Sequence, residues 1–186
     1  MGHIPENFIQ DVYENVPKVE DTGLAPTGFY KVSIGSISAD PTWTVVNELE
    51  FMQSIPNDRI VALQIGREIC QIPNLVDFMM LLHEKMADLG VVFITAPYWT
   101  SSEWANDFRN VQRITEYTFG LFSHTWCRQK GKRPISMGID FELLGIGWIF
   151  EEGWNCYGDE AKKYAKEHYL NSIREIKLTL KTIKGR

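Results

Sequence analysis

Most of the side chains that could do chemistry lie in one short segment. It runs Tyr98-Trp99-Thr100-Ser101-Ser102-Glu103-Trp104 and follows the apolar run at 91–94. Aromatic rings offer flat apolar surface with a polar edge, while hydroxyl and carboxylate groups orient hydrogen bonds. Such a mixture either binds a polar ligand, such as a sugar, or holds a loop-rich core together. Trp99, Glu103 and Trp104 are therefore the candidate ligand-binding residues.

Carboxylates near this segment and further along the chain suggest a second kind of chemistry. Glycosidases use paired acids, and Glu103 with either Asp140 or Glu142 supplies the right residue types. Asp140 and Glu142 are two residues apart on an expected strand, so they share one face of it. A solvent-facing polar side of a strand has the same spacing. A small glycoside hydrolase is therefore an alternative function.

Other catalytic and metal-binding patterns are missing from the sequence. Cys70, Cys127 and Cys156 are too widely separated for a Cys-x-x-Cys pair, and no histidine pair at i, i+4 suits a metalloprotease. The sequence contains neither a G-x-G-x-x-G turn nor a Walker A loop. We therefore expect three free, buried thiols and no assignable catalytic residue, metal ion or cofactor.

The composition fits one folded domain and excludes two classes of partner. The chain has 186 residues, 44% of them hydrophobic, and a formal net charge of −5. An acidic chain lacks the basic surface that broad binding to nucleic acid or anionic membranes needs. The sequence shows no signal peptide and no apolar run of about 18 residues. We expect synthesis in the cytoplasm, which also fits a virion protein.

Short strands and two early helices are expected to position the candidate residues. A short helix is expected at 5–15. A clearer helix is predicted to begin at its N-cap Asn74 and to end at Gly90. Alternating or β-prone residues predict strands at 30–34, 43–51, 59–65, 91–95, 135–143 and 145–150.

Residues 158–186 predict one long amphipathic helix. Apolar residues recur there at spacings of three and four, which is typical of a helix with one apolar face. Such a stripe must pack on the rest of the domain, 1–157, or on a neighbouring subunit. The residues expected at that interface are Tyr169, Ile173, Ile176 and Leu180.

Three pieces between residues 70 and 141 occur in a recognisable order. They are Ile72-Pro73-Asn74 followed by Phe78, then Tyr98–Glu103, then Arg133-Pro134-Ile135. Together they resemble a lectin-like domain of bacterial and phage surface proteins, in which the middle piece is a Tyr-Trp-Ser-Ser-Thr/Ser-Glu signature. The resemblance implies a C-type-lectin-like fold, with the signature mainly stabilising the fold.

The sequence therefore predicts a single α+β domain with a mixed or mostly antiparallel sheet and a long C-terminal helix. We expect a non-enzymatic structural or interaction subunit of a larger assembly, such as a phage virion or tail component. The alternatives are a carbohydrate-binding module and the small glycoside hydrolase. The expected partners are protein subunits, as a homo-oligomer or larger assembly, and for the binding module a glycan, with no nucleic acid or membrane.

Overall fold

The structure is a computed structural model that describes residues 30–34, 44–46, 52–53, 55–135 and 138–185. The helix expected at 5–15 lies outside the described residues. Among the helices of the described part, none is long and apolar enough to cross a lipid bilayer.

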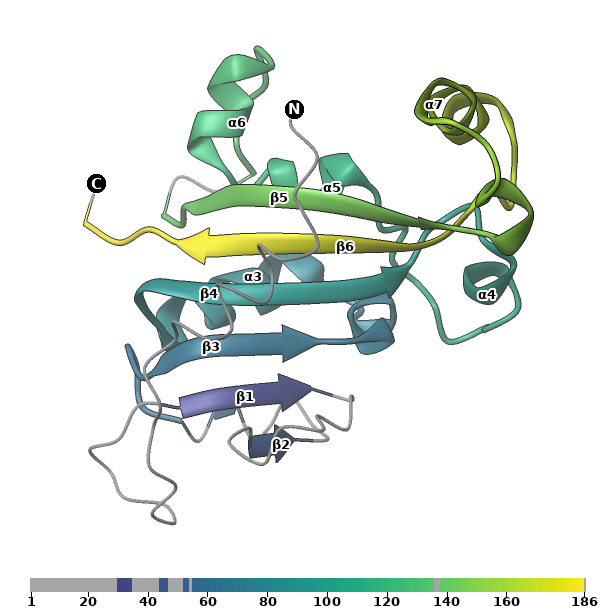
Figure 1. The fold of residues 1–186 in the computed structure, drawn as a ribbon. Coiled ribbons are helices and arrows are strands. Elements are labelled where there is room, and N and C mark those ends of the chain that lie inside the picture. Colours follow the sequence, from purple (N-terminus) through teal and green to yellow (C-terminus); the bar gives the residue numbers. More distant parts are fainter. Residues whose placement is uncertain (1–29, 35–43, 47–51, 54, 136–137, 186) are drawn as a thin grey trace.

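The strands of the described chain form one mixed sheet, shown face-on in Figure 1. Its spatial order is β2-β1-β3-β4-β6-β5. The first four strands run parallel, whereas β6 is antiparallel to both of its neighbours, β4 and β5. The strands are β1 (Tyr30–Ile34), β2 (Thr44–Val46), β3 (Ile60–Ile65), β4 (Met86–Pro97), β5 (Phe141–Phe150) and β6 (Ile173–Thr182).

The direction in which the chain winds reverses between β1 and β3. From β1 the chain moves outward to β2, and the next strand in sequence, β3, lies on the other side of β1. Winding then continues in the new direction to β4. In open sheets of this kind, ligands bind outside the carboxyl ends of the strands at the point of reversal.

Short helices follow the strands of the described chain. The helix predicted at Asn74 is confirmed, because the Asn74 side chain accepts a hydrogen bond from the backbone N–H of Asp77 at 3.2 Å. The helices are η1 (Arg67–Gln71), α3 (Leu75–Lys85), α4 (Ser102–Ala105), α5 (Glu116–Gly120), α6 (His124–Gln129), η2 (Glu152–Trp154) and α7 (Asp159–His168).

Helix α3 ends earlier than predicted, and Gly90 has a different role from the expected helix end. The helix stops at Lys85, and β4 begins at Met86. A Cβ atom at position 90 would lie 2.9 Å from the carbonyl oxygen of Ile60. Gly90 is therefore required where β4 passes close to the start of β3.

The core lies on one face of the sheet, against α3, which lies behind β4 in Figure 1. Residues that share this face across β3, β4 and β6 are fully or almost fully buried. They meet Phe78, Met79 and Leu82 of α3 in one apolar cluster. The strand residues are Leu63, Ile65, Val92, Ile94, Ala96, Ile176, Leu178 and Leu180.

The long C-terminal helix is a wrong prediction. Helix α7 ends at His168, and the chain re-enters the sheet as β6. Between them Asn171 adopts a left-handed backbone conformation, with φ at 56°. The apolar residues Ile176, Leu178 and Leu180 also alternate with period two, which is the pattern of a strand. The apolar residues of 173–182 therefore fit both the spacing of a helix and the alternation of a strand, and the chain forms the strand.

The predicted interface stripe is therefore divided between the core and the surface. Ile173, Ile176 and Leu180 have no exposed surface and pack inside this chain's own sheet. Tyr169, by contrast, is 52% exposed. The three buried residues cannot cover a neighbouring subunit, so this interface prediction is wrong for them.

The lectin-like fold and the mostly antiparallel sheet are also wrong. Four parallel strands and a winding reversal make an open α/β sheet. The pieces behind the resemblance serve other purposes here. Asn74 caps α3, and the Tyr98–Glu103 segment is the turn from the end of β4 into α4.

One exposed residue carries backbone strain that substitution can relieve. Leu89 has φ at 62° and is 60% exposed, and a left-handed conformation costs a branched residue about 1–2 kcal/mol. We expect Leu89→Asn to raise the free energy of unfolding by about 1 kcal/mol in urea denaturation, because asparagine tolerates this conformation. Leu170→Asn, at an exposed leucine with negative φ, is the control. Equal effects of the two changes would contradict the strain.

Candidate functional site

A cavity of about 430 Å³ opens at the carboxyl ends of β3 and β4, where β6 begins. We call it the carboxyl-edge crevice. It lies next to the point at which the winding of the sheet reverses, between β1 and β3. Its walls are formed by Gln64, Gly66, Arg67, Glu68, Thr95, Ala96, Pro97, Glu175 and Lys177.

Strand pairing brings residues from distant parts of the sequence to this crevice. Thr95 of β4 lies opposite Lys177 of β6, and Pro97 lies opposite Glu175. Gln64 of β3 pairs with Phe93, two residues before Thr95, so Gln64, Thr95 and Lys177 share one face of the sheet. This is the face opposite the apolar core.

The crevice carries both signs of charge. Arg67 and Lys177 are exposed cations, and Glu68 and Glu175 are half-buried carboxylates. The Oε2 atom of Glu68 is buried and has no hydrogen-bond partner within the described part of the chain. A buried carboxylate oxygen without a partner is costly, and Glu68 as a residue lines the crevice, where its carboxylate is a candidate acceptor for a ligand donor.

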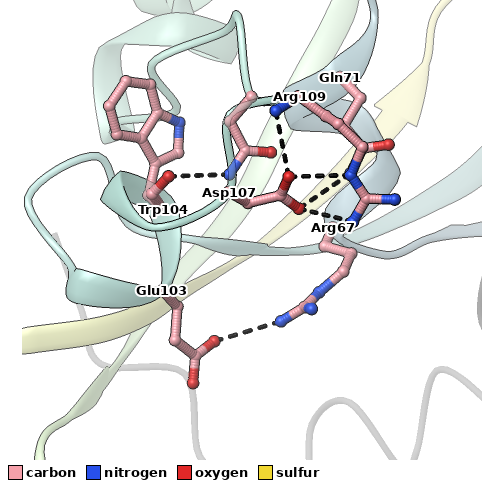
Figure 2. A network of polar contacts seen from close by, with 7 residues as sticks. Arg67, Gln71, Glu103, Trp104, Asp107 and Arg109 are labelled. Atoms are coloured by element: carbon pink, nitrogen blue, oxygen red, sulfur yellow. Dashed lines mark hydrogen bonds and ion pairs between the residues drawn. The ribbon is translucent and has the colours of Figure 1, made fainter.

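A polar network fixes the loop beyond β4 against η1, as Figure 2 shows. Arg67 donates to Glu103 across 3.4 Å, and Gln71 donates to Asp107 at the same distance. The guanidinium of Arg109 holds Asp107 through two hydrogen bonds of 2.8 and 2.7 Å. These hydrogen bonds from Arg109 lower the pKa of the Asp107 carboxyl to about 2.

The three predicted ligand residues have different surroundings. Glu103 pairs with Arg67, which lines the carboxyl-edge crevice, but Glu103 is not itself a lining residue. The indole N–H of Trp104 donates to the carbonyl oxygen of Gln112 at 2.8 Å, so its polar edge is used within the loop. Trp99 is 37% exposed, and the guanidinium of Arg113 lies about 6 Å from the rings of both tryptophans.

The carboxylates of the hydrolase alternative do not come together. Glu142 pairs with Lys181 at 2.5 Å, and Lys181 lies opposite Val91, in the middle of β4 and six residues before its end. Glu103 follows the carboxyl end of β4. Asp140 is buried and accepts a hydrogen bond from the backbone of His124. The glycoside hydrolase prediction is therefore wrong.

A second network attaches α5 and α7 to the end of β4. The Tyr98 hydroxyl donates to Glu116 at 3.0 Å, and Lys166 donates to the other oxygen of Glu116 at 3.1 Å. The Lys166 ammonium also lies 4.1 Å from the centre of the Trp148 ring. Burial and the neighbouring Glu116 raise the pKa of Tyr98, so this hydroxyl stays a hydrogen-bond donor.

All three cysteines are free, but one is not buried as predicted. Cys70 and Cys127 are buried, whereas Cys156 is exposed. Burial raises the pKa of Cys70 to about 12, so that its thiol is not a nucleophile at neutral pH.

Sequence reasoning missed Arg67, Glu68, Glu175 and Lys177. The available signal was weak: Gly66-Arg67-Glu68 places a glycine and two charged residues directly after a buried strand. Glu175 and Lys177 were hidden within the predicted C-terminal helix. Their place on the crevice follows only when residues 173–182 are recognised as a strand.

No protein-family model matches the chain, and no curated protein matches it. Similar solved structures include a SAM-dependent methyltransferase from Archaeoglobus fulgidus, with 14% identity, 84% of this chain and 87% of that chain covered, and a TM-score of 0.47. One from Mesorhizobium loti shows 9% identity, coverage of 92% and 96%, and a TM-score of 0.47. A possible histamine N-methyltransferase from Thermotoga maritima shows 10% identity, coverage of 95% and 87%, and a TM-score of 0.47.

These likenesses are too distant to carry a function, because each TM-score lies below 0.5. None of the three structures is a lectin-like domain or a virion component. The parallel sheet described above is what overturns the lectin-like resemblance. The prediction of a non-enzymatic phage subunit is also wrong, because the C-terminal helix that needed a neighbouring subunit is not formed and residues 173–182 are strand β6. The carbohydrate-binding alternative is not retained, since the indole N–H of Trp104 is used within the loop.

The hydrogen bond of Trp104 predicts a structural role for this side chain. We expect Trp104→Phe to lower the free energy of unfolding by about 1–2 kcal/mol, because the carbonyl of Gln112 loses its indole donor. Chemical denaturation measures the change. Tyr157→Phe, at an exposed aromatic residue, is the matched control. A stability equal to that of the wild type would show that Trp104 does not hold the loop.

The Asp107–Arg109 pair predicts an unusual titration. A carboxyl with a lowered pKa stays ionised as pH falls, so Asp107 should titrate near pH 2 by carboxyl ¹³C NMR. Any contribution of the pair to stability is present above the ordinary pKa of 3.8 and is lost as pH falls through about 2. Arg109→Ala should move the titration upward, and Arg128→Ala should leave it unchanged. A wild-type midpoint near 3.8 would contradict the pairing.

Proposed function

We propose that the carboxyl-edge crevice binds S-adenosylmethionine and that the chain is a methyltransferase-type domain. The proposal rests on a crevice at the carboxyl ends of β3 and β4, beside the winding reversal, whose lining residues carry both signs of charge. This proposal replaces the expectation of a structural subunit without a cofactor.

The charges of the crevice match the charges of this ligand. S-adenosylmethionine carries an ammonium, a carboxylate and a sulfonium cation. Arg67 or Lys177 would pair with the ligand carboxylate, and Glu68 would accept from the ammonium or lie against the sulfonium. Gln64 and Thr95 supply neutral hydrogen-bonding groups on the same wall.

The sequence after β1 favours a ligand without phosphate groups. Dinucleotide-binding sheets use a G-x-G-x-x-G turn so that the backbone can approach a pyrophosphate. This chain has Gly35-Ser36-Ile37 after β1, with one glycine, in a segment outside the described residues. S-adenosylmethionine contains a nucleoside but no phosphate, so it does not need that turn.

The volume of the crevice is compatible with a small molecule. Ligand pockets commonly span about 300–1,000 Å³. When bound, S-adenosylmethionine supplies an electrophilic methyl group to a nucleophile. The residues of this chain bind and orient the charged ends of the ligand, while the Arg67–Glu103 pair links the crevice wall to the loop beyond β4.

Isothermal titration calorimetry with S-adenosylmethionine and S-adenosylhomocysteine tests the proposal. We expect both to bind the wild type, with NAD binding much more weakly. Glu68→Gln should weaken S-adenosylmethionine binding about 10-fold, since a hydrogen bond to a charged group contributes about 1.5–3 kcal/mol. Arg67→Ala should weaken it by a similar factor.

Matched variants separate a local effect from a general effect of charge. Glu160→Gln and Arg128→Ala change exposed residues outside the crevice and should leave binding unchanged. The absence of any binding at millimolar concentrations of both adenosyl ligands would refute the proposal. Equal weakening of S-adenosylmethionine binding by Glu68→Gln and by Glu160→Gln would also refute the proposal.

A further inference from the structure

The outer edge of β5 borders a groove that the proposed methyl-transfer site does not use. Within the described sheet, β5 is a terminal strand and pairs with β6 on one side. A cavity of about 380 Å³ lies along its other side, next to α6. This β5 edge groove is lined by Ser123, Thr125, Trp126, Gln129, Glu142, Leu143, Leu144, Gly145, Ile146 and Trp148.

The lining residues show that the groove follows the strand edge and not one face of the sheet. Side chains of a strand alternate between faces, so a cavity over one face meets every second residue. This groove is lined by the consecutive residues 142–146. It therefore runs beside the backbone of β5, where the unpaired N–H and C=O groups of a terminal strand lie.

The groove is suited to bind an additional β-strand. Unpaired strand edges are templates for another extended chain, and natural proteins often block them with charge, proline or β-bulges. Strand β5 has one bulge, at Leu144. The ten residues of β5 contain one charged residue, Glu142, and no proline. Leu143, Ile146 and Trp148, which line the groove, are only partly buried against the core.

The charges at the two ends of β5 indicate the source and the direction of the additional strand. Near its start, beyond the end of α6, lie the exposed cations Arg128, Lys130, Lys132 and Arg133. Just past its end lie the exposed carboxylates Glu152, Asp159 and Glu160. Figure 1 shows α6 at one end of β5 and α7 at the other. An antiparallel copy of this strand would place its acidic end against the basic start.

We propose that the β5 edge groove is occupied by β5 of a second copy of this chain. The two strands pair antiparallel about a two-fold axis, so that each copy gives and receives the same contacts. The result is one continuous sheet through both copies. The interface is made by β5 and the flanking charges, and not by the stripe of Ile173, Ile176 and Leu180.

Leu144 allows the edge to be blocked without damage to the core. The neighbouring residues Leu143 and Gly145 pair with β6, whereas the register skips Leu144. Leu144 lines the groove and is absent from the central apolar cluster. A lysine there places a charge on the edge, which is a common natural block.

Sedimentation equilibrium of the full chain tests the proposal. The wild type should be a concentration-dependent dimer, and Leu144→Lys should raise its dissociation constant at least about 10-fold while keeping the far-UV spectrum. Met80→Lys, at an exposed apolar residue on α3, is the matched control and should dimerise like the wild type.

Charge reversal tests the orientation of the two strands. Lys132→Glu alone puts carboxylates together at both ends of the interface, and Glu152→Lys alone puts cations together. Each variant should dimerise about 10-fold more weakly, and an equimolar mixture should recover dimers because both contacts become attractive again. A monomeric wild type, undiminished dimers of Leu144→Lys, or no recovery in the mixture would overturn the proposal.

Discussion

The structure depends on the burial of one apolar face of the central sheet against α3. Fully burying one valine, leucine or isoleucine contributes about 1.5–3 kcal/mol, and each of β3, β4 and β6 buries two or three such side chains on this face. A one-residue shift in the register of any of these strands would turn that face outward. The same constraint assigns the alternate residues, including Gln64, Thr95 and Lys177, to the opposite face. The polar wall of the carboxyl-edge crevice is therefore a consequence of how the core is buried.

The elements that depend on nearby residues could be predicted from the sequence. Strands at 30–34, 60–65 and within 86–97 have clear alternation or a continuous apolar run, and Asn74 signals the start of α3. The segment from Ile173 to Thr182 could not be decided in this way, because its apolar residues fit both a helix and a strand. Pairing with β4 and β5 on both sides decides it. Residues 173–182 by themselves do not indicate that β4 and β5 will lie beside them.

The site was harder to predict than the fold because strand pairing, and not a sequence motif, brings its residues together. Glu103 stood out because of its aromatic and polar neighbours; it pairs with Arg67 but does not itself line the crevice. Trp104 stood out for the same reason, yet its indole N–H is used inside the loop. Arg67, Glu68 and Lys177 are ordinary charged residues in sequence. They become a candidate site when the carboxyl ends of β3 and β4 meet the beginning of β6.

The antiparallel direction of β6 explains why this edge can carry so much charge. A parallel strand at that position would bring its last residues to the carboxyl edge, and its chain would leave from there. An antiparallel strand instead enters at that edge, so Glu175 and Lys177 lie within regular structure, opposite Pro97 and Thr95. Backbone pairing on both sides holds these two side chains in place without a loop. The same strand separates the crevice from β5, so that the carboxyl-edge crevice and the β5 edge groove lie at different edges of one sheet.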